Sequence, residues 1–105
     1  MMRVSEADDG REIEVAVGET LELALPETSG TGFRWDFTSR GESILALEKE
    51  YTAAAATAPG SSRMRCWRFK AIAPGNAMLE LGYARPWETR AVRSFGLKLR
   101  TARLP

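Results

Sequence analysis

The stretch EIEVAVGETLELAL at residues 12–25 decides the fold, because apolar and polar residues alternate along it. The apolar positions of this alternation are Ile13, Val15, Val17, Leu21, Leu23 and Leu25. A period of two places successive side chains on opposite faces of an extended chain. The stretch therefore predicts two half-buried β-strands joined by a turn at Gly18 and Glu19.

The same alternation recurs along the rest of the chain. It is clear at residues 33–37, 67–71, 79–83 and 95–99, and weaker at 44–51, where a helical turn is the alternative. One sheet alone would leave its apolar face in water, so two sheets must pack face to face. We predict an all-β, antiparallel sandwich of about seven strands. It forms one domain over residues 1–105, with Trp35 and Trp67 in the core.

The chain has no histidine and one cysteine, Cys66. The missing histidines exclude Ser-His-Asp and Cys-His catalysis, histidine metal sites and the ligands of blue copper. A single cysteine cannot form an intrachain disulfide, and without a base to activate it we expect a packed or partly exposed thiol. We therefore expect no enzyme, no cofactor and no metal site.

Charge is distributed unevenly, although the net charge is only +1. Residues 1–27 hold eight acids against two bases, and residues 63–103 hold ten bases against two acids. We expect early acidic strands to lie beside late basic strands and neutralise them across the sheet. The alternative is a nucleic-acid patch, but no nucleic-acid-binding motif accompanies the bases, so we expect no nucleic-acid partner.

No apolar run resembles a signal peptide or reaches transmembrane length, so we expect no membrane partner. The protein is expected either in the cytoplasm or outside the cell after removal of a signal.

Three connections interrupt the strand pattern. They are PETSGTG at residues 26–32, TAAAATAPGSSR at 52–63 and ARPWETR at 84–90. Loops that follow alternate strands of a sandwich emerge at the same end. Counting strands, the first and third connections should be neighbours, and the second can join them.

These connections carry a resemblance to a known family. Arg85-Pro86-Trp87 follows a strand that ends in Tyr83, and residues 31–35 read Thr-Gly-Phe-x-Trp. A weaker third match is residues 60–62, Gly-Ser-Ser. In order and spacing, nearly the whole chain resembles the chagasin family, the immunoglobulin-like inhibitors of papain-type cysteine proteases. The resemblance implies an immunoglobulin-like fold and reversible inhibition of such a protease by three loops. We expect the protein to be a monomer when no protease is bound.

The resemblance implies a role for each connection. Thr31 would lie over the catalytic cysteine, Trp87 on the primed side of the cleft, and residues 57–63 along the non-primed side. Glycine lets the backbone approach another surface closely, and Pro86 pre-orders the segment around Trp87. The expected protease-binding residues are Thr28, Ser29, Gly30, Thr31, Gly32, Gly60, Ser61, Ser62, Arg85, Pro86, Trp87 and Glu88.

The chain also departs from the family pattern. Thr28-Ser29-Gly30 stands where the family has Asn-Pro-Thr, serines follow Gly60, and Arg65 replaces an expected aromatic residue. These changes bear on affinity and target range. Two alternatives stay open: an ordinary glycine turn at residues 30–32, and a Trp87 that folds back onto the sandwich. An immunoglobulin-like adhesion or assembly module is the alternative function.

Overall fold

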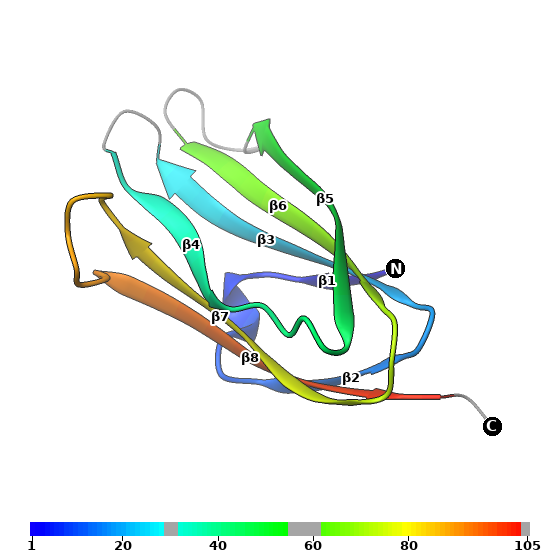
Figure 1. The fold of residues 1–105 in the computed structure, drawn as a ribbon. Coiled ribbons are helices and arrows are strands. Elements are labelled where there is room, and N and C mark those ends of the chain that lie inside the picture. The colour runs from blue at the N-terminus through cyan, green and yellow to red at the C-terminus, as the bar shows by residue number, and fades with distance from the viewer. Residues whose placement is uncertain (29–31, 55–61, 104–105) are drawn as a thin grey trace.

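The structure is a computed structural model that describes residues 1–28, 32–54 and 62–103. Eight strands and one short 3-10 helix make up this part of the chain (Figure 1). The elements are β1 (Met2–Val4), η1 (Glu6–Asp8), β2 (Glu12–Ala16), β3 (Thr20–Thr28), β4 (Arg34–Ser39), β5 (Leu45–Ala54), β6 (Ser62–Ala71), β7 (Gly75–Ala84) and β8 (Arg93–Ala102).

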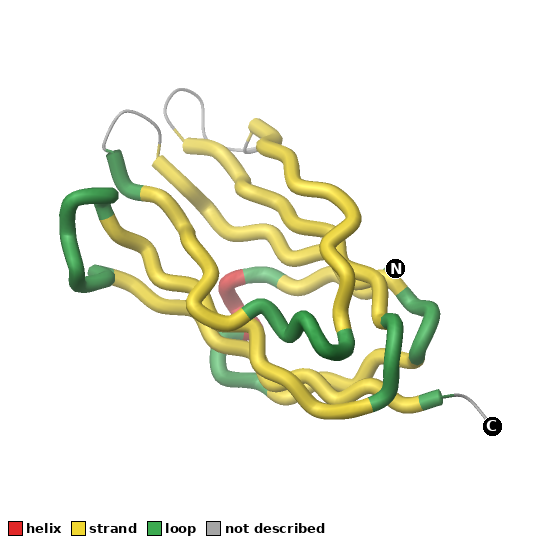
Figure 2. Tube along the Cα trace, in the orientation of Figure 1, coloured by secondary structure: helices red, strands yellow, loops and turns green. Residues whose placement is uncertain are grey.

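The strands form two four-stranded sheets that pack face to face, as Figures 1 and 2 show. One sheet has the order β1-β3-β6-β5 and the other β2-β8-β7-β4. The predicted all-β sandwich is therefore confirmed. The additional strand is β1, which is only three residues long and has no clear alternation in the sequence.

Two strand pairs are parallel within these otherwise antiparallel sheets. They are β1 with β3 and β2 with β8, and both involve the first strands of the chain. The chain leaves β1 through η1 and joins the other sheet as β2. β1 and β2 are therefore edge strands, one in each sheet. Neither pair alters the end of the sandwich where the three connections emerge.

Some strands extend beyond their predicted limits. Residues 26–28 continue β3, and residues 52–54 and 62–63 continue β5 and β6 into what the sequence reading treated as connections. Backbone ladders reach further than side-chain alternation because their hydrogen bonds do not depend on the apolar pattern. The weaker strand prediction at residues 44–51 is confirmed from Leu45 onward as β5, while Ile44 lies in the hydrogen-bonded turn that precedes the strand.

The core lies between the sheets and is lined by the predicted apolar positions. Trp35 and Trp67 are 2% and 1% exposed, which confirms their place in the core. Full burial of a large apolar side chain stabilises a fold by roughly 1.5–3 kcal/mol. Cys66 is buried as well, and burial raises the pKa of its thiol. The prediction of a packed, unreactive cysteine agrees with both observations.

Acidic and basic strands are neighbours, as the charge pattern predicted. β2 lies along β8 and β3 lies along β6. An Arg68 nitrogen is 3.8 Å from a Glu22 oxygen, and an Arg100 nitrogen is 3.7 Å from a Glu14 oxygen. Both side chains of the Arg100–Glu14 pair are exposed, so that pair contributes only about 0–1 kcal/mol, whereas Glu22 is buried. Over the described residues, no helix has the length and apolar character needed to cross a membrane.

Candidate functional site

The ladders bring the ends of β3, β5 and β7 and the starts of β4 and β6 to one end of the sandwich (Figure 1). The register pairs Thr28 with Ser62, Ala54 with Arg63, and Arg34 with Ala84. The described flanks of all three connections therefore lie together, as the strand count predicted. We call this end the rim. Its residues are 27–28, 32–34, 50–54, 62–65 and 84–93.

Hydrogen bonds tie the two sheets together at the rim. The backbone N–H of Thr28, at the end of β3, donates to the phenol oxygen of Tyr83 in β7 at 3.1 Å. The Trp35 indole N–H donates to the carbonyl oxygen of Pro26 at 2.8 Å, and the Trp35 backbone N–H donates to a Glu27 carboxylate oxygen at 3.2 Å. The last described residue before the 29–31 segment is thus held by the opposite sheet.

Arg85 links the first and third connections. Its guanidinium carbon lies 4.6 Å from the ring centre of Phe33 and 5.7 Å from that of Trp87. A guanidinium nitrogen lies 3.5 Å from a Glu88 carboxylate oxygen. Stacking of this kind is worth roughly 0.5–1 kcal/mol per pair when partly exposed. Arg85 therefore packs inside the rim between two aromatic rings.

Gly32 lies directly against Trp87. Its φ of +83° is in the left-handed region, and a Cβ built at this position would be 3.4 Å from Cη2 of Trp87. Glycine suits both requirements, because it adopts positive φ without strain and leaves room for the indole edge. The first and third connections, which were predicted to be neighbours, are thus in contact through Gly32 and Trp87.

A stack of rings continues from the rim into the core. Phe33 stacks on Tyr83 with ring centres 5.4 Å apart, and Tyr83 lies 4.8 Å from Trp35. The Arg93 guanidinium covers the Trp35 ring at 5.7 Å. Arg85, Phe33 and Trp35 therefore connect Trp87 to buried side chains of β4 and β7.

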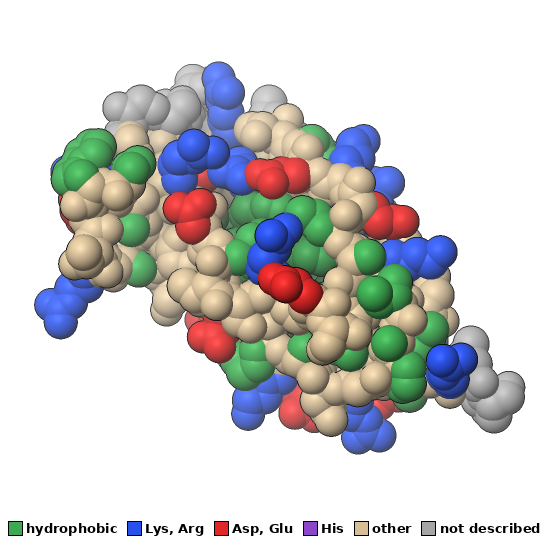
Figure 3. All heavy atoms as spheres, in the orientation of Figure 1, with side chains coloured by type: hydrophobic (Ala, Val, Ile, Leu, Met, Phe, Trp, Pro, Cys, Tyr) green, Lys and Arg blue, Asp and Glu red, His purple; other side chains and the backbone are tan. Residues whose placement is uncertain are grey.

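Trp87 projects into solvent with 71% of its surface exposed. The alternative in which it folds back onto the sandwich is wrong, since only its edge approaches Gly32. Val92, in the same connection, is also exposed. Figure 3 shows hydrophobic side chains gathered over the β7–β8 connection. Exposed aromatic surface on a pre-ordered loop is typical of residues that dominate protein–protein interfaces.

A groove lies within the rim between β4 and β5, and Arg65 is one of its lining residues. Thr28, Gly32 and Phe33 contribute to its lining. Arg65 is 8% exposed, pairs with Glu50 and lies 3.3 Å from a Glu27 oxygen. Its guanidinium also covers the ring of Trp67 at 5.0 Å. The arginine that replaces an expected aromatic residue is therefore neutralised by carboxylates from two strands, as a buried charge requires.

The predicted site residues are placed as follows. The described ones at the rim are Thr28, Gly32, Ser62, Arg85, Pro86, Trp87 and Glu88, with Ser62 as the first residue of β6. The others lie outside the described residues: Ser29, Gly30, Thr31, Gly60 and Ser61.

Sequence reasoning assigned no site role to Phe33, Tyr83 and Arg93, which support the rim from inside. A signal was available, because Phe33 and Tyr83 adjoin the motif residues along the chain. Among the described residues, no group of three or more His, Cys, Asp or Glu side chains could hold a metal ion.

Comparisons with known proteins bear on the rim and the fold together. The sequence model described as "Chagasin family peptidase inhibitor I42" matches residues 14–99. Chagasin of Trypanosoma cruzi is 32% identical over 90 residues, which cover 81% of this chain and 82% of chagasin.

Solved structures confirm the immunoglobulin-like sandwich. A cysteine protease inhibitor from Entamoeba histolytica has a TM-score of 0.86 at 20% identity, over 96% of this chain and 95% of that one. The solution structure of amebosin has a TM-score of 0.75 at 28% identity, over 96% and 97%. PbICP-C, solved in complex with falcipain-2, has a TM-score of 0.67 at 13% identity, over 99% and 100%. The extent of the family match and the identity to chagasin show that this chain belongs to the chagasin family of peptidase inhibitors.

Proposed function

We propose that this chain reversibly inhibits papain-type cysteine proteases by inserting the rim into the active-site cleft. Its family consists of cysteine protease inhibitors, which supports this class of target. The single observation that carries the proposal is the position of Trp87, which is 71% exposed and lies beside Gly32 on the rim. In this proposal residues 1–105 act as one domain and as a monomer when free.

Trp87 supplies most of the binding energy in this proposal. Pro86 fixes its own φ and favours an extended Arg85, so the connection loses little entropy on docking. The stack of Arg85 on Phe33 supports the indole from inside the rim. We place Trp87 on the primed side of the cleft, where its large, rigid surface would exclude water.

The connection at residues 28–32 forms the central wedge in this proposal. Thr31 lies outside the described residues, and we propose that it covers the catalytic thiol of the protease. The described end of this segment supports a narrow wedge, because Gly32 has positive φ and no side chain. Residues 57–63 would lie along the non-primed side and bind through main-chain hydrogen bonds, as an extended substrate does.

An inhibition titration with matched variants tests the proposal. Wild type, Trp87→Ala and Ile72→Ala are titrated against papain and falcipain-2 with a fluorogenic peptide substrate. Ile72 is the control because it is also a large exposed apolar residue, 49% exposed, but it follows β6 at the far end of the sandwich. We expect Trp87→Ala to raise the inhibition constant about 30-fold, equivalent to about 2 kcal/mol for a hot-spot residue. Ile72→Ala should leave it unchanged.

Two results would count against the proposal. One is the absence of inhibition by the wild type at micromolar concentration across papain-type enzymes. The other is inhibition that Trp87→Ala and Ile72→Ala weaken equally. Because both side chains are largely exposed, thermal melts of the two variants should match the wild type, which separates a binding defect from unfolding.

A further inference from the structure

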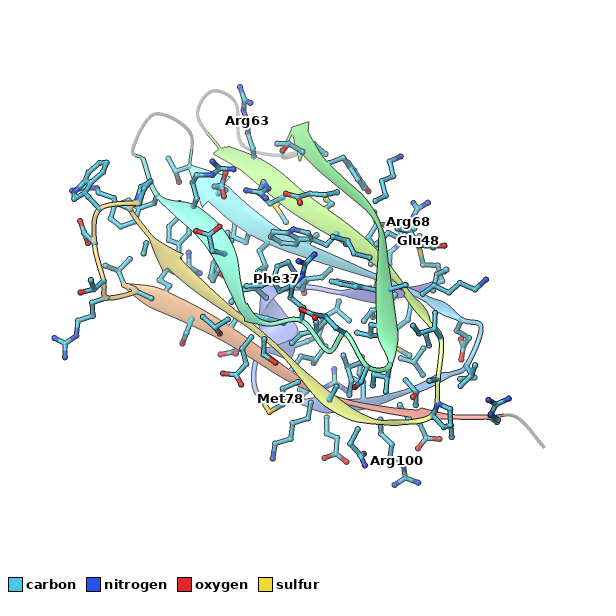
Figure 4. All side chains as sticks on the ribbon, in the orientation of Figure 1. Phe37, Glu48, Arg63, Arg68, Met78 and Arg100 are labelled. Carbon is cyan, nitrogen blue, oxygen red and sulfur yellow. The ribbon has the colours of Figure 1, made fainter. Side chains whose placement is uncertain are left out.

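Each of the three connections at the rim is flanked by, or contains, one arginine without an ion pair among the described residues. Arg34 follows the first connection, Arg63 is the last residue of the second, and Arg90 is the last residue of the third. All three are exposed. Figure 4 shows Arg63 projecting away from the sheets, and Figure 3 shows basic side chains at this end of the molecule.

The other rim arginines are neutralised by neighbouring carboxylates. Arg85 pairs with Glu88, Arg93 pairs with Glu6, and Arg65 lies between Glu27 and Glu50. The exposed positive charge that remains for a partner is therefore that of Arg34, Arg63 and Arg90. We call these the three rim arginines.

Positive charge is concentrated at the rim. The rim holds six arginines and three glutamates, and Glu6 pairs with its Arg93, which together give a net charge of +2, whereas the whole chain has +1. The rest of the chain is therefore net negative. Residues 29–31 and 55–61 contain no charged side chain, so they do not alter the balance. Asp36, two residues further along β4, reduces the charge at this end but leaves it positive.

A charged surface of this kind acts mainly on the rate of association. Complementary charge steers two proteins together and raises the association rate by roughly 10- to 1,000-fold at low salt, and salt removes the effect. Here the charge surrounds the proposed binding residues on all three connections. It therefore acts on the partner that these residues contact.

We propose that the three rim arginines direct this inhibitor to papain-type proteases whose cleft entrance carries net negative charge. The inference rests on the proposed function and adds a preference among targets. A nucleic acid is a poorer partner for this surface, because Glu88 adjoins Trp87 and Glu50 adjoins Arg65, where a phosphate backbone would be repelled.

Association rates of charge-matched variants test the inference. The rim variant is Arg34→Gln, Arg63→Gln and Arg90→Gln combined. The control variant, Lys70→Gln, Lys98→Gln and Arg103→Gln combined, removes the same charge from exposed positions outside the rim. Rates are taken from inhibition progress curves at about 20 mM and about 500 mM salt. The distance over which charges interact falls severalfold between these two concentrations. The targets are papain-type enzymes chosen for acidic or basic cleft entrances in their structures.

With acidic targets at low salt, we expect the rim variant to associate about 10-fold more slowly than wild type. Its dissociation rate should stay within about 2-fold, and the difference should disappear at high salt. The control variant should associate within about 2-fold of wild type. Basic targets should bind wild type more slowly than acidic ones.

The inference is overturned if the rim variant keeps the wild-type association rate and salt dependence, or if acidic and basic targets associate equally fast. It is also overturned if the rim variant loses retention on a heparin column but inhibits unchanged, because the arginines would then serve a polyanion. Failure of the wild type to inhibit any enzyme would contradict the proposed function itself, which is a distinguishable result.

Discussion

The guanidinium of Arg85 lies over the ring of Phe33, with its central carbon 4.6 Å from the ring centre. Its other neighbour is the Trp87 ring, so the arginine fills the space between the start of β4 and the exposed indole. This arrangement makes Arg85 a support for Trp87 within the inhibitor. Its contribution to binding should therefore act through the position of the indole.

Arg85→Ala should leave the Trp87 indole without its support and raise the inhibition constant about 10-fold. Arg85→Lys should fall between alanine and wild type, because an ammonium keeps the charge but cannot stack as a plane on two rings. The ¹⁹F NMR signal of 5-fluorotryptophan at Trp87, identified from its loss in Trp87→Ala, should narrow and shift as the indole becomes mobile. An unchanged signal in Arg85→Ala would contradict the supporting role.

Tyr51 of β5 provides a test of a hydrogen bond to Glu22 of β3. Its phenol donates a hydrogen bond to a Glu22 carboxylate oxygen, which raises the pKa of Tyr51 to about 12. A raised pKa means that the folded state favours the neutral phenol. The stabilisation is therefore complete below the ordinary value near pH 10 and is lost as the pH rises from about 10 to about 12.

Ultraviolet absorbance of the phenolate should show a transition near pH 12 that is missing in Tyr51→Phe. Glu22→Gln removes the negative acceptor, so the same transition should move down toward pH 10. Unfolding in denaturant at pH 9 and pH 11 should show the wild type losing stability over this interval more than Tyr51→Phe does. The hydrogen bond would be contradicted if the transition that Tyr51→Phe removes lay at pH 10.

The sandwich could be predicted from the sequence because its strands are half-buried. Leu21, Leu23 and Leu25 occupy one face of β3, and the alternation that places them in the core is visible without coordinates. β1 could not be predicted in this way, because its pairing with β3 depends on backbone hydrogen bonds along only three residues. The limits of β5 and β6 at the rim were also predicted wrongly, because backbone hydrogen bonds extend these strands beyond the apolar alternation.

The convergence of the connections could be predicted from strand parity, and the motifs named Gly32 and Trp87 as binding residues. The contact between these two residues could not be predicted, because it depends on the φ of Gly32 and on the stack of Arg85 over Phe33. The ion-pair partners of Arg65 could not be predicted from the sequence. Its neutralisation comes from Glu27 and Glu50 on two other strands, which only the register brings together.

Tyr83→Phe should weaken the link between the sheets at the rim. The substitution keeps the ring that stacks on Phe33 but removes the oxygen that accepts the Thr28 N–H at 3.1 Å. We expect a loss of about 1 kcal/mol in the free energy of unfolding, which is typical of one hydrogen bond. Hydrogen exchange followed by NMR should show the Thr28 amide exchanging faster, while that of Leu23 in mid-strand is unchanged. An equally slow Thr28 amide in the variant would contradict this link.

Gly32→Ala should affect both stability and inhibition, for two separate reasons. The φ of +83° disfavours any residue with a Cβ, at a cost of about 1–2 kcal/mol, and the new Cβ would lie 3.4 Å from Cη2 of Trp87. Gly10→Ala is the matched control, because Gly10 has nearly the same φ, +81°, with no atom within 4 Å of the added Cβ. Thermal denaturation should show similar destabilisation in the two variants. Only Gly32→Ala should also raise the inhibition constant, by about 10-fold, because only there does the backbone that must relax from positive φ lie against the indole that the proposal places in the protease cleft. Equal inhibition by the two variants would show that the position of Trp87 beside Gly32 has no part in binding.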